Sequence, residues 1–386
     1  MTKKYIMNKV FIDIEIKEVL NAKDRKEFAK LPFYIYKNNK FWVPNLIKDD
    51  IKNIDKSQNP AFEQCEAKFW LAYKNNKCVG RIGAIINYEY NKKVNEKIGR
   101  FSRAEFIDDK EVSSKLFATA EDWLKIKGMT RILGPLGFNN FDNQGLLVEG
   151  FDYLPSIAST YHLPYYKEHI ENSGYEKEID WLEFRLTISD IPENALRLNE
   201  VIKKRYNVRV LNLTSKNEVN KYANEVFDLL NIAFDEIPFV SPFTEKLKEY
   251  YIKKYFSFLN PKFIKIIVND ENKVIGFVIA MPSLSKAMQK AAGKLLPFGF
   301  FHILKALKKP EYMDLILTGI DPKLQGQGIS ALLITELQKE FLAFNIKYVE
   351  TTGMFETNHK AIQHWKNYEH IQHKRRRCYT KKILLI

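Results

Sequence analysis

The sequence predicts a mixed α/β fold, an α+β mixed sheet formed by two successive modules of similar design. Three observations support this prediction. The chain has 386 residues, about twice the size of a usual domain. Short apolar strands alternate with amphipathic helices, and their order in the first half recurs in the second, as an internal duplication would produce. With 45% hydrophobic and 13% aromatic residues the chain can form two cores, which excludes global disorder.

The first module, residues 1–190, is expected to begin with a strand and an amphipathic stretch. Two strands joined by a Lys-Asn-Asn-Lys turn follow, and then a strand, a helix, a strand, a helix that Gly174 ends, and a closing strand. In chain order these segments are 11–19, 23–37, 69–87, 100–107, 111–127, 131–136 and 163–188.

The second module, residues 191–386, is expected to repeat this order, with one insertion at 285–310. A strand leads to a helix, and two strands flank the turn Asn-Asp-Glu-Asn. After the insertion come a strand, a helix, a strand, a helix and a final hairpin. These segments are 208–214, 218–234, 263–268, 273–281, 313–320, the helix from 329, 347–355, the helix from 358, and 374–386.

The composition restricts the kinds of partner and site. Three scattered cysteines and seven dispersed histidines indicate neither a disulfide framework nor a metal site, so no metal is expected. No apolar run approaches the ~20 residues of a membrane-spanning helix, and no signal peptide is visible, so a cytoplasmic location is expected. The net charge of +14 predicts an anionic partner (nucleic acid, acidic lipid, acidic carrier protein or phosphorylated cofactor) unless the lysines are simply solvated.

The most informative segment is residues 317–341, LTGIDPKLQGQGISALLITELQKEF. A strand ends at Ile320, an Asp-Pro pair breaks it, and a helix with apolar spacing begins near Ile329. The two glycines between them let successive backbone N–H groups face one point at the helix N-terminus. Such amides, together with the helix dipole, can hold a diphosphate, and the small Ser330 does not block it. A glycine-containing turn without a ligand is the alternative.

This segment resembles the Q/R-x-x-G-x-G/A signature of the GNAT acyltransferases, with Gln325 first, Gly328 as the glycine and Ser330 last, where the family prefers Gly or Ala. The order of elements in residues 208–386 also resembles that fold. The resemblance implies acetyl-CoA or a longer acyl-CoA as co-substrate, or an acyl carrier protein as donor. It also implies that the strand before the loop pairs with the pantetheine arm, and that a backbone N–H polarises the thioester carbonyl. The residues assigned to the cofactor are Gly319, Ile320, Gln325, Gly326, Gln327, Gly328, Ile329, Ser330 and Asn358.

The same resemblance implies direct attack of a neutral amine on the thioester, which needs a base for the amine proton and an acid for the leaving thiolate. Candidates for the base are Glu350, on the strand 347–355, and Glu356, just before the last helix. Either can equally be a solvated surface carboxylate, and Glu356 can belong to a helix cap.

The acid is less clear. Many family members carry a Tyr in the last helix, where this chain has Trp365, and an indole cannot supply the proton. His364, Tyr368 and Tyr379 are nearby substitutes, each with a structural explanation as well. Cys378 has no His-Asp pair that would make it a nucleophile.

The first module lacks the glycine loop. Its counterpart is IDDKEVSSKLF (107–117), which has three acids at a helix N-terminus, where they suit the dipole but repel a diphosphate. We expect this degenerate GNAT-like half not to bind coenzyme A, and to shape the acceptor side or stabilise the second half.

The insertion at 285–310 has six lysines, no acid and an apolar segment, with Phe300, Ile303, Leu304 and Leu307 on one helical face. A basic amphipathic segment of this kind is typical of contact with an anionic membrane surface or an acidic partner such as an acyl carrier protein. The alternative is a helix packed on its own domain with its lysines in water.

As a whole, the chain resembles a group of two-domain GNAT-like bacterial proteins that includes bacterial ceramide synthases. The matching segments are KFWVPNLIKDD, the NP of QNPAFE, VGRIGAIIN, GLLVEGF, LPYYKE, KLLPFGF and Glu356-Thr-Asn358. The resemblance implies transfer of an acyl group to a primary amine, with a long-chain sphingoid base at the inner membrane surface as the acceptor. Departures at TTGMFETN and RRRCY leave the specificity open.

Four alternatives stay open on the sequence alone. The chain can be a non-catalytic acyl-CoA-binding protein, or an acetyltransferase of a small-molecule or protein amine. A nucleic-acid binder would use the run Lys374–Arg377, but no nucleic-acid-binding module accompanies it. A tRNA-dependent aminoacyl transferase would not need the diphosphate loop.

Overall fold

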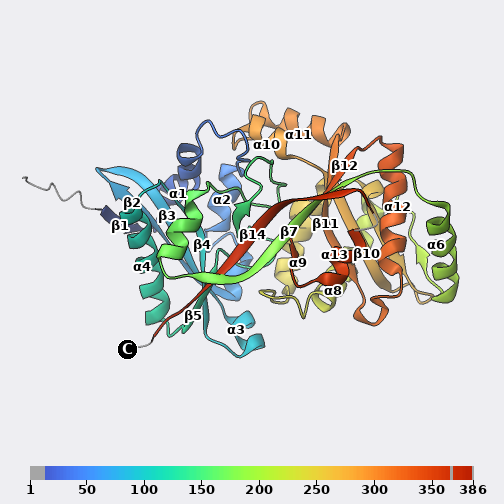
Figure 1. Ribbon diagram of the computed structural model, residues 1–386, viewed down its shortest axis with the longest axis horizontal. Coiled ribbons are helices and arrows are strands. Elements are labelled where there is room, and N and C mark those ends of the chain that lie inside the picture. Colours follow the sequence, from blue (N-terminus) through green and yellow to red (C-terminus); the bar gives the residue numbers. More distant parts are fainter. Residues whose placement is uncertain (1–13, 366–367, 385–386) are drawn as a thin grey trace, which may run out of the picture.

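The computed structural model describes residues 14–365 and 368–384, apart from the side chains of Ser257 and His364 (Figure 1). The first half contains β1 (Ile14–Glu18), α1 (Ala22–Ile35), α2 (Ile47–Asn53), β2 (Cys65–Lys74), β3 (Lys77–Asn87), α3 (Tyr88–Val94), β4 (Ile98–Phe106), α4 (Lys110–Ile126), β5 (Arg131–Gly134), β6 (Leu146–Glu149), α5 (Tyr165–Asn172) and β7 (Glu176–Thr187).

The second half contains α6 (Glu193–Arg205), β8 (Arg209–Val210), α7 (Lys216–Lys221), α8 (Ala223–Ala233), α9 (Glu245–Tyr255), β9 (Ile264–Val268), β10 (Val274–Pro282), α10 (Ser285–Ala291), α11 (Gly299–Lys308), β11 (Tyr312–Ile320), α12 (Ile329–Ala343), β12 (Tyr348–Thr351), β13 (Met354–Phe355), α13 (His359–Trp365) and β14 (His370–Lys382). The predicted mixed α/β fold and the repeated order of elements are confirmed: β2–β3–β4–α4–β5–α5–β7 corresponds to β9–β10–β11–α12–β12–α13–β14.

All the described strands belong to one sheet, and its central strands come from opposite halves of the chain. The order is β1-β2-β3-β4-β5-β14-β7-β12-β11-β10-β9-β8. Strand β7, which ends the first half, pairs with β12 of the second, and β14, which ends the second half, pairs with β5 of the first. Figure 1 shows these two strands crossing the middle of the molecule side by side. Each half is therefore completed by the last strand of the other half.

The prediction of a hairpin at 374–386 is wrong for residues 374–384; residues 385–386 lie outside the described part of the chain. Residues 370–382 form one long strand, β14, which pairs with β7 from His370 to Thr380 and with β5 from Tyr379 to Lys382. Because partners are available along both of its edges, the strand has no need to turn back on itself.

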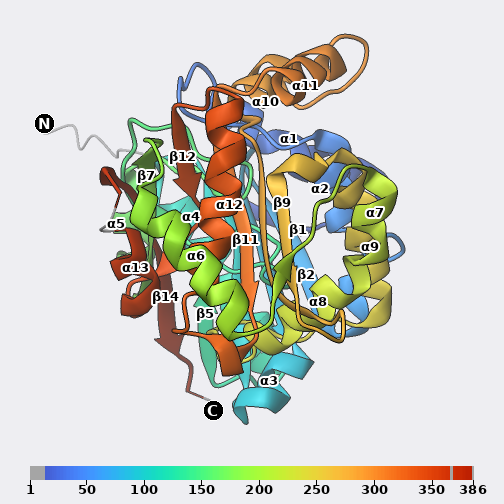
Figure 2. The same cartoon turned by 90° about the vertical axis from the view of Figure 1, so that its right-hand side faces the viewer.

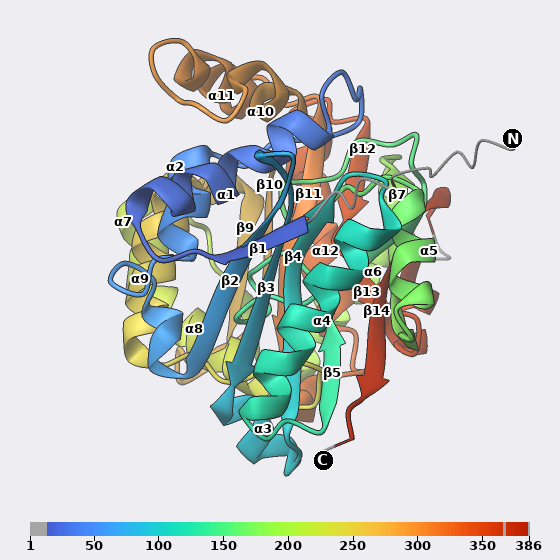
Figure 3. The ribbon, with the colours of Figure 1, turned by 90° about the vertical axis from the view of Figure 1, so that its left-hand side faces the viewer.

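Three main hydrophobic clusters hold the two halves together. One is shared: it joins Phe28, Phe69 and Ile85 of the first half to Phe227 and Phe277 of the second. A second lies under α4 and α5, the helices seen in Figure 3, and a third under α12 and α13, the helices seen in Figure 2. The second cluster contains a residue of β14 and the third contains residues of β7, so neither core is complete without the exchanged strand.

The helices that follow β4 and β11 begin differently. Helix α4 is capped by Asp109, whose carboxylate accepts hydrogen bonds from the N–H groups of Glu111 and Val112 at 3.0 and 3.2 Å. Helix α12 begins at Ile329 with Gly328 as its N-cap residue, and no side chain caps it. Within the described ranges, no helix combines the length and the apolar character that crossing a bilayer requires.

Candidate active site

Strands β11 and β12 separate part-way along their length. They pair in parallel from Tyr312 and Tyr348 to Leu315 and Thr351, after which the chain leaves β12 and forms β13 against β7. At the same point the ladder between β10 and β11 shifts register, and Ile316 stands opposite no residue in either described ladder. Such a bulge bends a strand and re-aims its groups. The carbonyl of Ile316 accepts a hydrogen bond from the Thr352 hydroxyl at 3.4 Å. Beyond Ile316, β11 has no partner on the side of β12 in the described ladders, and an extended ligand can pair to this open edge.

The N-terminus of α12 lies directly after this strand. Gly326 and Gly328 have φ of +77° and +85°, a conformation that glycine adopts readily. In the described part of the chain, the N–H groups of residues 328–331 have no hydrogen-bond acceptor. A Cβ added at Gly326 would have no atom within 4 Å, so the loop is open on that side. Unpaired amides at the positive end of a helix form a site that suits a diphosphate.

The other residues assigned to the cofactor have identifiable contacts. The Gln325 and Gln327 side chains donate to the carbonyls of Ile320 and Lys323, at 3.4 and 2.9 Å, so both hold the loop in shape. Ile329 is buried in the core beneath α12. Ser330 is half-buried, with its N–H in the unpaired set.

Three more assigned residues lie nearby. Gly319 and Ile320 are on the open part of β11 and pair on their other side with Phe277 and Gly276 of β10. A Cβ at Gly319 would lie 2.5 Å from the Phe277 ring, which explains the glycine by packing. Asn358 accepts a hydrogen bond from the N–H of Ala361 at 3.2 Å and caps α13.

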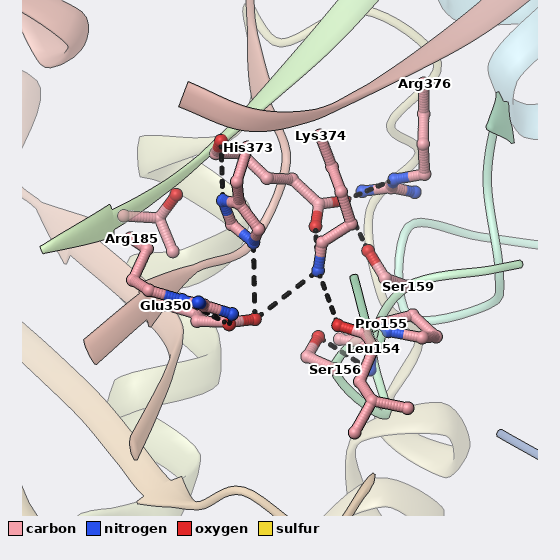
Figure 4. Close-up of polar contacts among 12 residues, drawn as sticks. Leu154, Pro155, Ser156, Ser159, Arg185, Glu350, His373, Lys374 and Arg376 are labelled. Carbon is pink, nitrogen blue, oxygen red and sulfur yellow. Dashed lines mark hydrogen bonds and ion pairs between the residues drawn. The ribbon is translucent and has the colours of Figure 1, made fainter. Parts of the chain in front are cut away.

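Glu350 lies on β12 beside the separation point, but its carboxylate is fully engaged (Figure 4). Arg185 donates to it at 2.6 and 3.0 Å, and Lys374 and His373 approach its other oxygen at 3.3 and 3.4 Å. Burial would raise the pKa of Glu350, but these cationic partners lower it well below the usual range. Since a general base works best with a pKa near the operating pH, the geometry argues against Glu350 as the base.

Glu356 also has structural partners. Its carboxylate accepts from the N–H of Asp180 at 3.1 Å and pairs with Lys177 at 2.8 Å, which ties the segment before α13 to β7. This is the role of a local brace between two strands, so the contacts do not single Glu356 out as a proton acceptor.

Tyr379, a candidate for the acid, lies in the first half of the molecule and not beside β11. Because β14 runs straight through, Tyr379 lies opposite Gly134 of β5 and is buried in the first half's core, with its hydroxyl 3.3 Å from Glu171. It belongs to the wrong half to serve a thiolate leaving from β11. Cys378 beside it is fully buried, and burial raises the pKa of its thiol, so it is also unsuited to be a nucleophile.

The remaining acid candidates give no clear donor. The Trp365 indole N–H donates to the sulfur of Met354 at 3.1 Å, and the ring is buried in the core under α12. Tyr368 is half-buried against the same core. The side chain of His364 is outside the described part of the chain.

Asp314 was not among the residues chosen from the sequence, yet it stands out in the structure. It lies on β11 two residues before the bulge, it is fully buried, and neither carboxylate oxygen has a hydrogen-bond partner among the described residues. Burial, and then the nearby charge of Glu350, raise the pKa of Asp314 to about 8. An acid inside the apolar run MDLILTGI was the signal in the sequence that could have identified it.

A buried polar network surrounds these two carboxyl groups. Glu183 of β7 is 1% exposed and accepts from Arg376 at 2.6 Å, while Lys374 lies 3.2 Å from it. Figure 4 shows Lys374 between Glu350 and the carbonyl of Leu154, to which it donates at 2.9 Å. Although burial raises the pKa of Glu183, Lys374 and Arg376 lower it to about 2. The network joins both exchanged strands to the loop of the first half near residue 154.

The basic run of β14 is consequently neutralised inside the protein. Lys374 and Arg376 are 1% and 4% exposed, and Arg375 and Arg377 both pair with the buried Asp180. These contacts support the expectation that the run does not bind nucleic acid.

The first half has the corresponding strand separation, but other groups fill it. Beyond the β4–β5 pairing, Leu136 donates to the carbonyl of Phe101 at 2.9 Å. The Tyr166 hydroxyl lies 3.0 and 3.1 Å from the N–H and the carbonyl of Phe106, and Tyr165 bonds to the same carbonyl. The edge that β11 leaves open is occupied here, and α4 is capped by a carboxylate. Both features support the expectation that the first half does not bind coenzyme A.

Comparisons with known proteins agree with this geometry. Residues 224–368 match the model of the acetyltransferase (GNAT) family. Protein YghO of Escherichia coli K12 is 28% identical over 376 residues, covering 95% of each chain. The bacterial ceramide synthase of Caulobacter vibrioides is 26% identical over 371 residues, covering 91% of this chain and 93% of that protein. A solved tandem GNAT protein from the clavulanic acid biosynthesis pathway superposes with a TM-score of 0.55 at 12% identity, covering 96% and 98% of the two chains.

Proposed function

We propose that this chain, a two-domain member of the GNAT superfamily, transfers an acyl group from acyl-CoA to a primary amine, with a long-chain sphingoid base as the acceptor. One observation carries the proposal: the open edge of β11 leads directly to the uncapped N-terminus of α12. An extended pantetheine arm ending in a diphosphate has this shape and charge.

The donor side uses main-chain groups. The N–H groups of residues 328–331 would hold the diphosphate, and the backbone of β11 beyond Ile316 would pair with the pantetheine amides. The thioester would then lie near the bulge, where a backbone N–H of β11 would polarise its carbonyl oxygen. Ser330 in place of the family's Gly or Ala leaves the amides accessible because its side chain is small.

The proton chemistry is assigned to Asp314 in place of the two glutamates. The amine nitrogen forms a bond to the thioester carbon, the carbon–sulfur bond breaks, and the thiolate of coenzyme A leaves. The proton that the attacking amine loses passes to the Asp314 carboxylate, directly or through one water. With a pKa of about 8, roughly one-tenth of this carboxyl group is ionised at pH 7, and that ionised form is a stronger base than Glu350, whose pKa is lowered.

The acceptor is proposed from chemistry and similarity together. The polar network of Glu183, Glu350 and Lys374 lies beside the loop of the first half near residue 154, so both halves contribute to that side. One relative, which aligns with this chain over 93% of its own length, is a bacterial ceramide synthase. A long-chain amine is the acceptor that fits this relative's name.

The test is turnover. Purified protein incubated with sphinganine and either palmitoyl- or acetyl-CoA is expected to form the amide, detected by mass spectrometry, with one thiol released per amide. The acyl-CoA that gives the higher kcat/KM identifies the donor length. Binding of acyl-CoA without amide formation from sphinganine or from any amine in a panel of small-molecule and peptide amines would support a non-catalytic binding protein and refute the proposal.

A further inference from the structure

The insertion between β10 and β11 consists of two helices with very different surroundings. Helix α10 is fastened to the first half: Ser285 donates to the carbonyl of Pro155 at 2.6 Å, and Gln289 donates to the carbonyls of Lys40 and Trp42 at 2.9 and 3.0 Å. Helix α11 is not: Gly299 is its only buried residue. Figures 1, 2 and 3 show both helices standing out at one end of the molecule.

The segment around α11 concentrates exposed apolar surface. Of the 17 large hydrophobic side chains that are exposed in the described residues, five lie within positions 295–304. They are Leu295 (41% exposed), Leu296 (70%), Phe298 (70%), Phe301 (56%) and Leu304 (46%). Single exposed apolar residues are ordinary, but a contiguous group marks a contact surface.

Basic side chains surround this apolar group. Lysines 286, 290, 294, 305, 308 and 309 are exposed, and residues 285–310 contain no Asp or Glu. Lys286 pairs with Glu311 at 3.2 Å, and the other five form no ion pair with any described residue. The described part of the protein therefore does not neutralise the positive charge of this surface.

The solvent-facing arc of α11 carries both kinds of side chain. With a turn of 100° per residue, Phe298, Phe301 and Leu304 fall on the same side as Lys305, Lys308 and Lys309, and all six are exposed. Ile303 and Leu307, which the sequence placed on a common apolar face with Leu304, are only half-buried against the protein. A face that mixes large apolar groups with lysines suits a bilayer interface, where rings enter the acyl boundary and ammonium groups reach lipid phosphates.

We propose that α11 and the preceding turn, residues 295–309, are the surface by which this protein docks on an anionic lipid bilayer. Charge complementarity favours a bilayer: Lys305, Lys308 and Lys309, which form no ion pair with a described residue, share the exposed arc of α11 with the apolar group, so a flat anionic surface can meet them together. Helix α10, anchored to the first half, holds the docking surface in a fixed orientation. Docking would bring lipid to the side of the molecule where β10 and β11 meet the insertion. The insertion lies close to β11 at this point: Ser283, just before α10, donates its N–H to the carbonyl of Tyr312.

The experiment is vesicle co-sedimentation of the full-length protein, which requires no turnover and is therefore independent of the proposed transferase activity. Binding is expected to vesicles of phosphatidylcholine mixed with phosphatidylglycerol, and to be much weaker with phosphatidylcholine alone. Lys305→Gln/Lys308→Gln/Lys309→Gln should lower the partition coefficient on anionic vesicles by roughly fivefold per lysine, or about a hundredfold together. Phe298→Ser/Phe301→Ser should lower it by roughly tenfold per ring.

The matched control is Ile126→Ser, which removes an apolar side chain that is 82% exposed at the end of α4 and should leave binding unchanged. Circular dichroism checks that each variant is folded, and the lysine variant tests the proposal even if the phenylalanine variant does not fold. Three results would overturn the proposal: no sedimentation with anionic vesicles, equal binding to neutral and anionic vesicles, or binding to an acidic acyl carrier protein without binding to vesicles.

Discussion

Replacing Asp314 by Asn tests the buried carboxyl group beside the β11 bulge. Asn has nearly the same size but cannot ionise, so the difference between the parent and Asp314→Asn isolates one titration. Burial and the charge of Glu350 raise the folded-state pKa from 3.8 to about 8. Below pH 4 the group is protonated in both the folded and the unfolded chain, and it does not change the free energy of unfolding.

Between pH 4 and pH 8 the folded chain retains a proton that the unfolded chain has lost. The free energy of unfolding of the parent must therefore fall as the pH rises, by about 1.4 kcal/mol per pH unit relative to the variant. At pH 7 the variant is expected to be up to about 4 kcal/mol more stable than the parent, apart from a constant offset, against a total stability of about 5–15 kcal/mol.

The assay is urea unfolding of both proteins at a series of pH values from 4.5 to 8. Parallel stability curves would show that the carboxyl group is not held protonated, and would remove the reason for choosing it as a proton acceptor. If the choice is right, kcat/KM of the parent rises with pH to a plateau above an apparent pKa of about 8, and Asp314→Asn loses about 10²–10⁴-fold in rate.

Gly326→Glu is expected to abolish the increase in Tm that coenzyme A gives the parent, whereas Gly128→Glu should retain it. The two glycines have φ of +77° and +78° and equally open surroundings, so equal losses would attribute the effect to backbone strain and not to the anion site. Glu350→Gln should lower the free energy of unfolding by about 3–5 kcal/mol, because it removes the carboxylate that pairs with two buried or half-buried cationic groups, Arg185 and Lys374; an unchanged urea midpoint would contradict this. The two halves, 1–190 and 191–386, should each be unfolded or aggregated when expressed alone and should associate when co-expressed. A folded, monomeric half seen by size-exclusion chromatography and circular dichroism would contradict this expectation.

The repeated order of elements could be predicted from the sequence because apolar periodicity and turn residues are local signals. The arrangement of the last strands could not. A hairpin at 374–386 and a single strand have the same local propensities, and the choice depends on partners such as Gly134 that lie far away in the sequence. Tyr379 was therefore placed near the wrong chemistry.

The candidate site shows the same difference between local signals, which can be predicted from the sequence, and distant contacts, which cannot. The candidate anion loop could be predicted because glycines before a helix allow a backbone conformation in which successive N–H groups face an anion. The proposed proton acceptor, Asp314, could not, since the role of a carboxyl group depends on what surrounds it. Glu350 pairs with Arg185 and Lys374, whereas Asp314 lies in an apolar strand and its carboxylate has no hydrogen-bond partner among the described residues. Burial and pairing of this kind appear only once the sheet is assembled.

The crossing of β7 and β14 also bears on how such a chain arises. A one-module ancestor that exchanged its final strand with an identical copy would have formed a symmetric dimer by domain swapping. When the two copies are joined in one gene, the strand exchange becomes intramolecular and permanent. If residues 325–330 hold the cofactor, as proposed, natural selection needs to preserve such a loop in only one copy. The first half can carry acids at the start of the corresponding helix and still be retained, because its strand β7 is part of the core of the second half.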